Sequence, residues 1–119
     1  MIKAILLSLF VALLMVGCGD GIVDYDDLEN RNGVTYLADE ETPFTGRAEI
    51  FHENKQKKAE ATFKDGKADG LMTMWYENGH KSMEGNYKDG KRNGLTVRWD
   101  EDGTEWFRGT FKNGEPVEN

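Results

Sequence analysis

The sequence predicts an all-β fold: an antiparallel meander of β-hairpins in a single-layer or slightly rolled sheet of about seven to nine strands, after an N-terminal signal helix. Residues 46–69, 70–93 and 94–117 align without a gap, which indicates a repeat of 24 residues. Each copy holds two strand-like runs rich in aromatic side chains, and Asn-Gly or Asp-Gly pairs separate many of these runs. Such pairs favour tight hairpins, because glycine accepts positive φ without a Cβ clash.

The central copy defines the hairpin, with predicted strands at 71–76 and 80–87. A two-residue loop at Asn78-Gly79 and a three-residue loop at Glu77-Asn78-Gly79 place opposite sets of side chains on one face, because a one-residue slip flips a strand. The three-residue loop separates apolar from polar side chains better, so we expect Gly79 and Gly103 at positive φ. It predicts a single aromatic face that includes Leu71, Thr73, Trp75, Met83, Gly85, Tyr87, Leu95, Val97, Trp99, Phe107, Gly109 and Phe111.

The first copy departs most from this pattern. Arg47 and Glu49 stand where the later copies have Leu and Thr or Val, and Lys55 replaces the turn glycine. Terminal repeats are commonly atypical because they close the array. Before it, Asn32-Gly33 predicts a turn and residues 34–37 a short strand, while Pro116 blunts the last edge because proline lacks an N–H donor.

The units WYENGHKSMEGNYKDGKRNG and RWDEDGTEWFRGTFKNG, with PFTG at 43–46, resemble MORN repeats, in particular the second bacterial type found in YwqK-like proteins. The resemblance extends from about residue 32 to 114. It implies an interaction module, and YwqK-like proteins also carry an antitoxin label.

Residues 1–17 predict a lipoprotein signal peptide. The apolar run 4–16 is short for a transmembrane helix and suits a signal-peptide core, and Met15-Val16-Gly17-Cys18 resembles a bacterial lipobox. Cys18 is then the lipidated residue, and its acyl chains anchor the protein to the membrane. A short transmembrane anchor and an ordinary signal peptide with an incidental cysteine stay open. The resemblance to envelope lipoproteins implies a bacterial envelope location, at the outer membrane facing the periplasm if the host has two membranes.

Charge is unevenly distributed along the chain. Residues 20–45 carry eight acids and one base, whereas residues 46–117 carry thirteen of each. The neutral repeat region argues against nucleic acid as a partner, which requires a basic face. The acidic stretch 18–31 is predicted to be a tether preceding a repeat domain at 32–119, although Ile22, Val23 and Tyr25 could pair with the first hairpin.

No constellation in the sequence predicts catalysis, a cofactor or a metal. His52 and His80 stand at hairpin turns without a Cys or second His at ligand spacing. The repeated Glu and Asp columns at 53/77/101 and 65/89/113 are explained better by turn chemistry than by cation binding. We therefore expect a non-enzymatic, envelope-anchored module that binds an unknown protein partner. The alternative is an antitoxin or immunity protein that neutralises a toxin by direct binding.

Five aromatic residues are the candidates for partner binding. Aromatic anchors dominate protein interfaces, and a single-layer sheet leaves its apolar face open. The same residues also qualify as the core of a thin sheet, so both roles stay open. Glycines 85 and 109 are expected to leave shallow gaps between them. The candidates are Trp75, Trp99, Tyr87, Phe111 and Phe107.

Overall fold

The computed structural model describes residues 22–118, which form ten strands and one 3₁₀ helix. In chain order these are β1 (Ile22–Asp24), η1 (Tyr25–Asp27), β2 (Leu28–Arg31), β3 (Val34–Leu37), β4 (Gly46–Phe51), β5 (Lys57–Lys64), β6 (Lys67–Trp75), β7 (Lys81–Lys88), β8 (Lys91–Trp99), β9 (Glu105–Lys112) and β10 (Glu115–Pro116). The predicted signal peptide and Cys18 lie outside the described residues.

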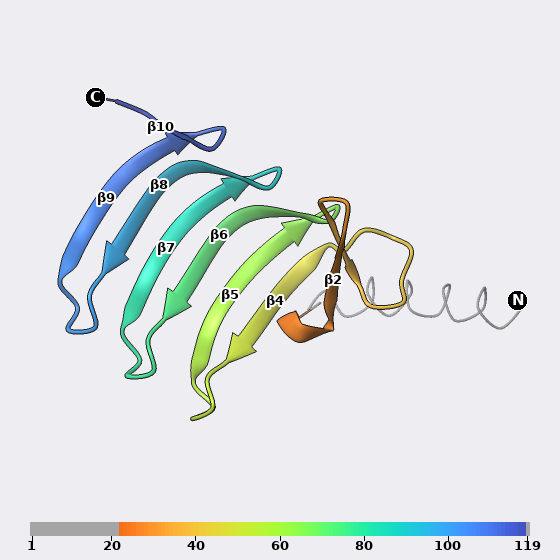
Figure 1. Cartoon of the computed structure of the whole chain (residues 1–119), viewed down its shortest axis with the longest axis horizontal. Helices are drawn as coiled ribbons and strands as arrows, with labels where there is room; N and C mark the ends of the chain where they lie inside the picture. The colour runs from red at the N-terminus through yellow and green to blue at the C-terminus, as the bar shows by residue number, and fades with distance from the viewer. Residues whose placement is uncertain (1–21, 119) are drawn as a thin grey trace, which may run out of the picture.

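The prediction of an all-β meander is confirmed. Strands β4 to β10 follow one another in a single antiparallel sheet, and β1 adds to the β4 edge in parallel. Figure 1 shows the three hairpins side by side as a curved ladder, with β2 crossing near one end. Strands β2 and β3 form a separate two-stranded sheet, joined by the predicted Asn32-Gly33 turn, in which both residues have positive φ.

Two kinds of turn alternate along the array. Within each repeat, a three-residue loop closes the hairpin with its third residue at positive φ: 73° at Lys55, 93° at Gly79 and 94° at Gly103. The Tyr76 N–H donates to His80 O at 2.8 Å, and the Gly79 N–H donates to Tyr76 O at 3.0 Å. The predicted conformation of Gly79 and Gly103 is therefore confirmed. Between strands of successive hairpins, two-residue Asp-Gly or Asn-Gly turns have positive φ at both positions.

The predicted single aromatic face is wrong, because each hairpin contains a bulge that the loop alone does not reveal. Trp75 pairs with Lys81, yet Met74 pairs with Met83, so Ser82 is an extra residue in β7. Lys58 and Trp106 are the extra residues at the same place in β5 and β9. A bulge shifts the pairing by one residue and reverses which side chains share a face.

The bulge divides the predicted set between two sides of the sheet. The phenylalanine face is the side that carries Phe63, Met72, Met74, Met83, Tyr87, Phe107 and Phe111. The tryptophan face is the opposite side, with Phe51, Leu71, Trp75, Leu95 and Trp99. This arrangement gathers the methionines with the aromatic rings of β7 and β9, and it places Glu60 and Glu84 on the tryptophan face beside Thr73.

Within the predicted tether, residues 22–31 form β1, η1 and β2. Val23 pairs with Ala48, as the expected contact with the first hairpin requires, and Asp24 caps η1 by accepting from the Asp26 N–H at 2.8 Å. Apolar burial outweighs the acidic composition here, because Val23 and Leu28 pack against a core cluster on the first repeat. That cluster consists of Phe44, Ala48, Ala61 and Phe63. Leu28 of β2 and Phe44, which follows β3, thus pack on the phenylalanine face at the first repeat.

Candidate functional site

On the phenylalanine face, aromatic rings and Met83 fill the space beside the strand glycines. A Cβ at Gly109 would lie 3.0 Å from the ring of Phe107, and one at Gly85 would lie 3.7 Å from the ring of Tyr87 and 3.9 Å from Met83. The expected gaps at these glycines are therefore absent. Between the two glycines lies Thr96, which is 1% exposed and whose hydroxyl has no hydrogen-bond partner among the described residues. This side of the sheet is its packed side.

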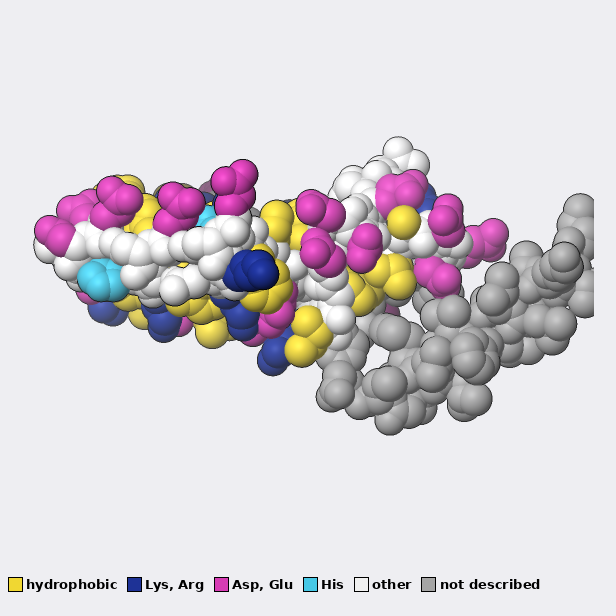
Figure 2. Space-filling model, turned by 90° about the horizontal axis from the view of Figure 1, so that it is seen from below, with side chains coloured by type: hydrophobic (Ala, Val, Ile, Leu, Met, Phe, Trp, Pro, Cys, Tyr) yellow, Lys and Arg dark blue, Asp and Glu magenta, His cyan; other side chains and the backbone are white. Residues whose placement is uncertain are grey.

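The tryptophan face carries more exposed apolar surface. Phe51, Leu71 and Leu95 expose 50%, 47% and 40% of their surfaces, while Trp75 and Trp99 are half-buried. Beneath these side chains, Thr73 and Val97 are 7% and 4% exposed. Figure 2 views the array from the side of its three-residue loops, with basic side chains gathered mostly along the lower face.

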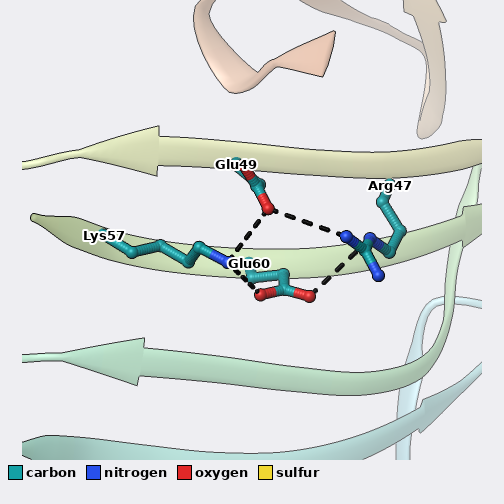
Figure 3. Close-up of polar contacts among 4 residues, drawn as sticks. All are labelled: Arg47, Glu49, Lys57 and Glu60. Carbon is teal, nitrogen blue, oxygen red and sulfur yellow. Dashed lines mark hydrogen bonds and ion pairs between the residues drawn. The ribbon is translucent and has the colours of Figure 1, made fainter. Parts of the chain in front are cut away.

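The first repeat replaces this apolar surface by a network of four charges on the tryptophan face (Figure 3). The Lys57 ammonium lies 2.8 Å from a Glu60 carboxylate oxygen and 3.0 Å from Glu49, and the Arg47 guanidinium bridges the same carboxylates at 3.7 and 3.8 Å. The hydrogen bond from Lys57 to Glu60 raises the pKa of Lys57 most, and the hydrogen bond to Glu49 raises it further. The departures at Arg47 and Glu49 thus compensate each other, and Phe51 is the exposed apolar side chain that the first repeat contributes to this face.

Side chains join the three-residue loops into a ladder. Asn54 Nδ2 donates to Glu77 O at 3.0 Å, and Asn78 Nδ2 donates to Glu101 O at 2.8 Å. Two residues before each of these asparagines, a second side chain contacts the next repeat. His52 Nε2 lies 2.9 Å from Trp75 O, and the Tyr76 hydroxyl donates to Trp99 O at 2.8 Å. Each repeat therefore holds the next one through two side chains, which fixes the spacing of the surfaces above.

The ladder ends at the third repeat. Asp100 and Asp102 occupy the positions of Tyr76 and Asn78, and a carboxylate has no N–H or O–H to donate onward. Asp102 still accepts from the Thr104 N–H at 3.0 Å, and this bond lowers its pKa. The change from donor to acid is a local signal, present in the sequence, that the array stops here.

The structure separates the five predicted partner-binding residues. Trp75 and Trp99 lie together on the tryptophan face, whereas the other three lie on the phenylalanine face. There Phe111 is 9% exposed, and Tyr87 and Phe107 are half-buried. The sequence interpretation missed Trp106, the most exposed large apolar side chain of the described chain at 57%, because it took the bulge position for an ordinary strand residue.

Neither histidine belongs to a cluster of ligands. His52 is occupied by the contact with Trp75 O, and between residues 22 and 118 no group of three or more His, Cys, Asp or Glu side chains could hold a metal ion. That same part of the chain contains no helix of the length and apolarity that crossing a bilayer requires. What the geometry offers is a pair of differently built surfaces on a regular scaffold.

Comparison with known families identifies the repeats. The sequence model of the MORN repeat variant matches residues 44–65 and residues 68–89, with the same spacing that the hairpins show. Residues 44–65 and 68–89 are MORN repeats. The third hairpin lies outside both matches but has the same loop and bulge as the second. The chain has no significant match among curated proteins or among solved structures.

MORN repeats suggest a module for protein or membrane interaction, and proteins built from them are in general binding modules and not enzymes.

Proposed function

We propose that this MORN-repeat chain is an envelope-anchored lipoprotein that binds a protein partner through the tryptophan face. The observation that carries the proposal is the exposed apolar surface over the second and third repeats, where Leu71 and Leu95 flank the half-buried Trp75 and Trp99. An apolar patch without a second layer is typical of a partner site, and tryptophan is enriched among the residues that dominate binding energy.

Two features support this surface over its opposite. On the phenylalanine face, side chains fill the space beside Gly85 and Gly109, and Leu28 and Phe44 pack over the first repeat. On the tryptophan face, the charge network of Arg47, Glu49, Lys57 and Glu60 borders the apolar patch on one side. A polar rim around an apolar centre is the usual anatomy of a protein interface.

The test compares pull-down of envelope proteins by the parent with pull-down by Trp99→Ala, with thermal unfolding measured alongside. Truncation of an aromatic anchor at a hot spot weakens binding by roughly 2 kcal/mol or more, or about thirtyfold. The double variant Leu71→Ser/Leu95→Ser removes exposed apolar surface without touching the core, and Val117→Ser, 43% exposed at the chain end, is the control. Folded variants that retain every partner would refute the proposed surface.

The anchor is tested separately. Cys18→Ala is expected to move the protein from the detergent phase to soluble or unprocessed forms, because it removes the thiol that carries the acyl chains. Unchanged partitioning of this variant would exclude lipidation at Cys18 and would favour a short transmembrane anchor instead. An outer-membrane location is checked by fractionation of the parent protein, with Cys18→Ala as its control.

The antitoxin alternative shares the binding surface but assigns it a different partner. Under that alternative, the captured protein is a toxin, co-expression of the chain abolishes its toxicity, and Trp99→Ala restores it. Capture of partners without such activity supports the interaction module instead.

A further inference from the structure

A cluster of aromatic rings and arginines lies at the far end of the phenylalanine face. The rings of Trp106 and Phe107 are 6.2 Å apart between centroids, and those of Phe107 and Phe111 are 6.4 Å apart. The Arg98 guanidinium lies 5.9 Å from the Trp106 ring, and the Arg92 guanidinium lies 5.2 Å from the Phe111 ring. We call these five residues the arginine–aromatic patch.

The two arginines of the patch differ from the other three arginines of the chain. Arg31, Arg47 and Arg108 each pair with a glutamate, whereas Arg92 and Arg98 form no ion pair with any residue between 22 and 118. Stacking engages the flat face of a guanidinium and leaves N–H groups at its edge for a planar acceptor. The Arg92 Nε donates only a long bond of 3.4 Å to the Tyr87 hydroxyl.

Elsewhere in the chain, a cation that lies over an aromatic ring also binds a carboxylate. Arg31 lies 4.4 Å from the centre of the Tyr36 ring and at the same time donates from Nε to a Glu29 carboxylate oxygen at 2.9 Å. Lys57 repeats this arrangement, 5.6 Å from the Trp75 ring and bound to Glu60. Two of these four stacked cations therefore hold a carboxylate, and the two in the patch do not.

The first repeat shows how the position of Arg92 is filled elsewhere in the array. Phe44 packs on Phe63 with ring centroids 5.8 Å apart, and three acids, Asp39, Glu40 and Glu41, precede it in the chain. Phe63 is the counterpart of Phe111 two repeats earlier. Arg92 is the counterpart of Phe44, because the Gly66 N–H donates to Phe44 O and the Gly114 N–H donates to Arg92 O. At the other end of the array a guanidinium therefore lies over the ring where the first repeat has an apolar side chain.

We propose that the arginine–aromatic patch docks an acidic peptide segment of a partner protein, with carboxylates on Arg92 and Arg98 and an apolar side chain against Trp106. Charge complementarity and the 57% exposure of Trp106 support this occupant. The site is separate from the tryptophan face, because it lies on the opposite side of the sheet, and its failure would leave the binding role of that face intact.

The test uses the full chain in non-ionic detergent and a fluorescein-labelled peptide, ADEETPFT, which copies residues 38–45. Fluorescence anisotropy is expected to show binding that weakens with added salt, and to show at least about tenfold weaker binding to Arg92→Gln/Arg98→Gln, because charge-assisted hydrogen bonds are lost. The neutral peptide ANQQTPFT is expected to bind at least about tenfold more weakly than the acidic one to the parent chain.

Arg108→Gln is the control, because it removes an arginine from the tryptophan face. Trp106→Ala provides a second variant whose exposed side chain is not needed for folding, and it is expected to weaken binding while thermal unfolding stays unchanged. Equal binding of the two peptides, or equal weakening by Arg108→Gln, would overturn the proposal. So would absence of peptide binding together with arginine-dependent binding to phosphatidylglycerol vesicles, which would assign the patch to lipid headgroups.

Discussion

Gly66→Ala tests how the N-terminal segment is fixed to the array. Gly66 lies in the first Asp-Gly turn at φ 83°, where its N–H donates to Phe44 O at 2.7 Å and its carbonyl accepts from the Thr35 N–H at 2.8 Å. A Cβ built there would overlap Val34 Cγ1 and would lie 2.9 Å from Thr35 O and 3.1 Å from Pro43 Cβ. The turn and the segment 34–44 would have to separate.

Gly90→Ala supplies the matched comparison. Gly90 occupies the same position of the next turn at φ 85°, but the nearest atom to its Cβ would be Lys67 Cβ at 3.8 Å. Both substitutions carry the cost of a left-handed alanine, about 1 kcal/mol. Only Gly66→Ala adds overpacking, which costs about 1–3 kcal/mol. We therefore expect losses of about 2–4 kcal/mol for Gly66→Ala and about 1 kcal/mol for Gly90→Ala.

Urea unfolding followed by tryptophan fluorescence measures the difference. With a slope of about 1–2 kcal/mol per molar urea, the Gly66→Ala midpoint should fall about 0.5–3 M below that of Gly90→Ala. Equal midpoints would mean that the segment 34–44 moves aside without cost. The packing of Phe44 on the first repeat would then contribute little to stability.

Two further predictions concern the three-residue loops. Gly79→Val should cost about 1–2 kcal/mol through left-handed strain alone, since its Cβ would meet only Gln56 Oε1 at 3.4 Å; a variant as stable in urea as the parent would contradict the loop geometry. Asn78→Asp keeps the acceptor for the His80 N–H but loses the donor to Glu101 O, so we expect a loss of about 1 kcal/mol. Asp102→Asn, which has no following repeat to bind, should leave the free energy of unfolding nearly unchanged in the same urea measurement. Equal losses of stability for Asn78→Asp and Asp102→Asn would contradict a ladder in which each repeat donates to the next.

Local sequence signals predicted most of the fold, because they depend on conformations that few residues tolerate. The glycines of the Asp-Gly and Asn-Gly pairs adopt positive φ in the structure, and their spacing of 24 residues is enough to set the number and order of the hairpins. The strand at residues 34–37 and the three-residue loops at Gly79 and Gly103 follow from the same chemistry. Acidic composition misled at residues 22–31, because a few apolar contacts of Val23 and Leu28 were enough to order the segment.

The faces of the sheet were decided by tertiary structure. A three-residue loop by itself pairs residues of equal parity, which would unite Trp75 with Met83 and Tyr87. The extra residue at Ser82 reverses this pairing after one step. Met83 and the ring of Tyr87 then pack beside Gly85 and the ring of Phe107 beside Gly109, while Glu60 and Glu84 lie on the opposite side of the sheet. Ser82 itself carries no local mark of a bulge, because its position is set by the packing of strands on either side. The sequence by itself therefore determined where the chain turns, whereas only the assembled sheet determined which side chains face a partner.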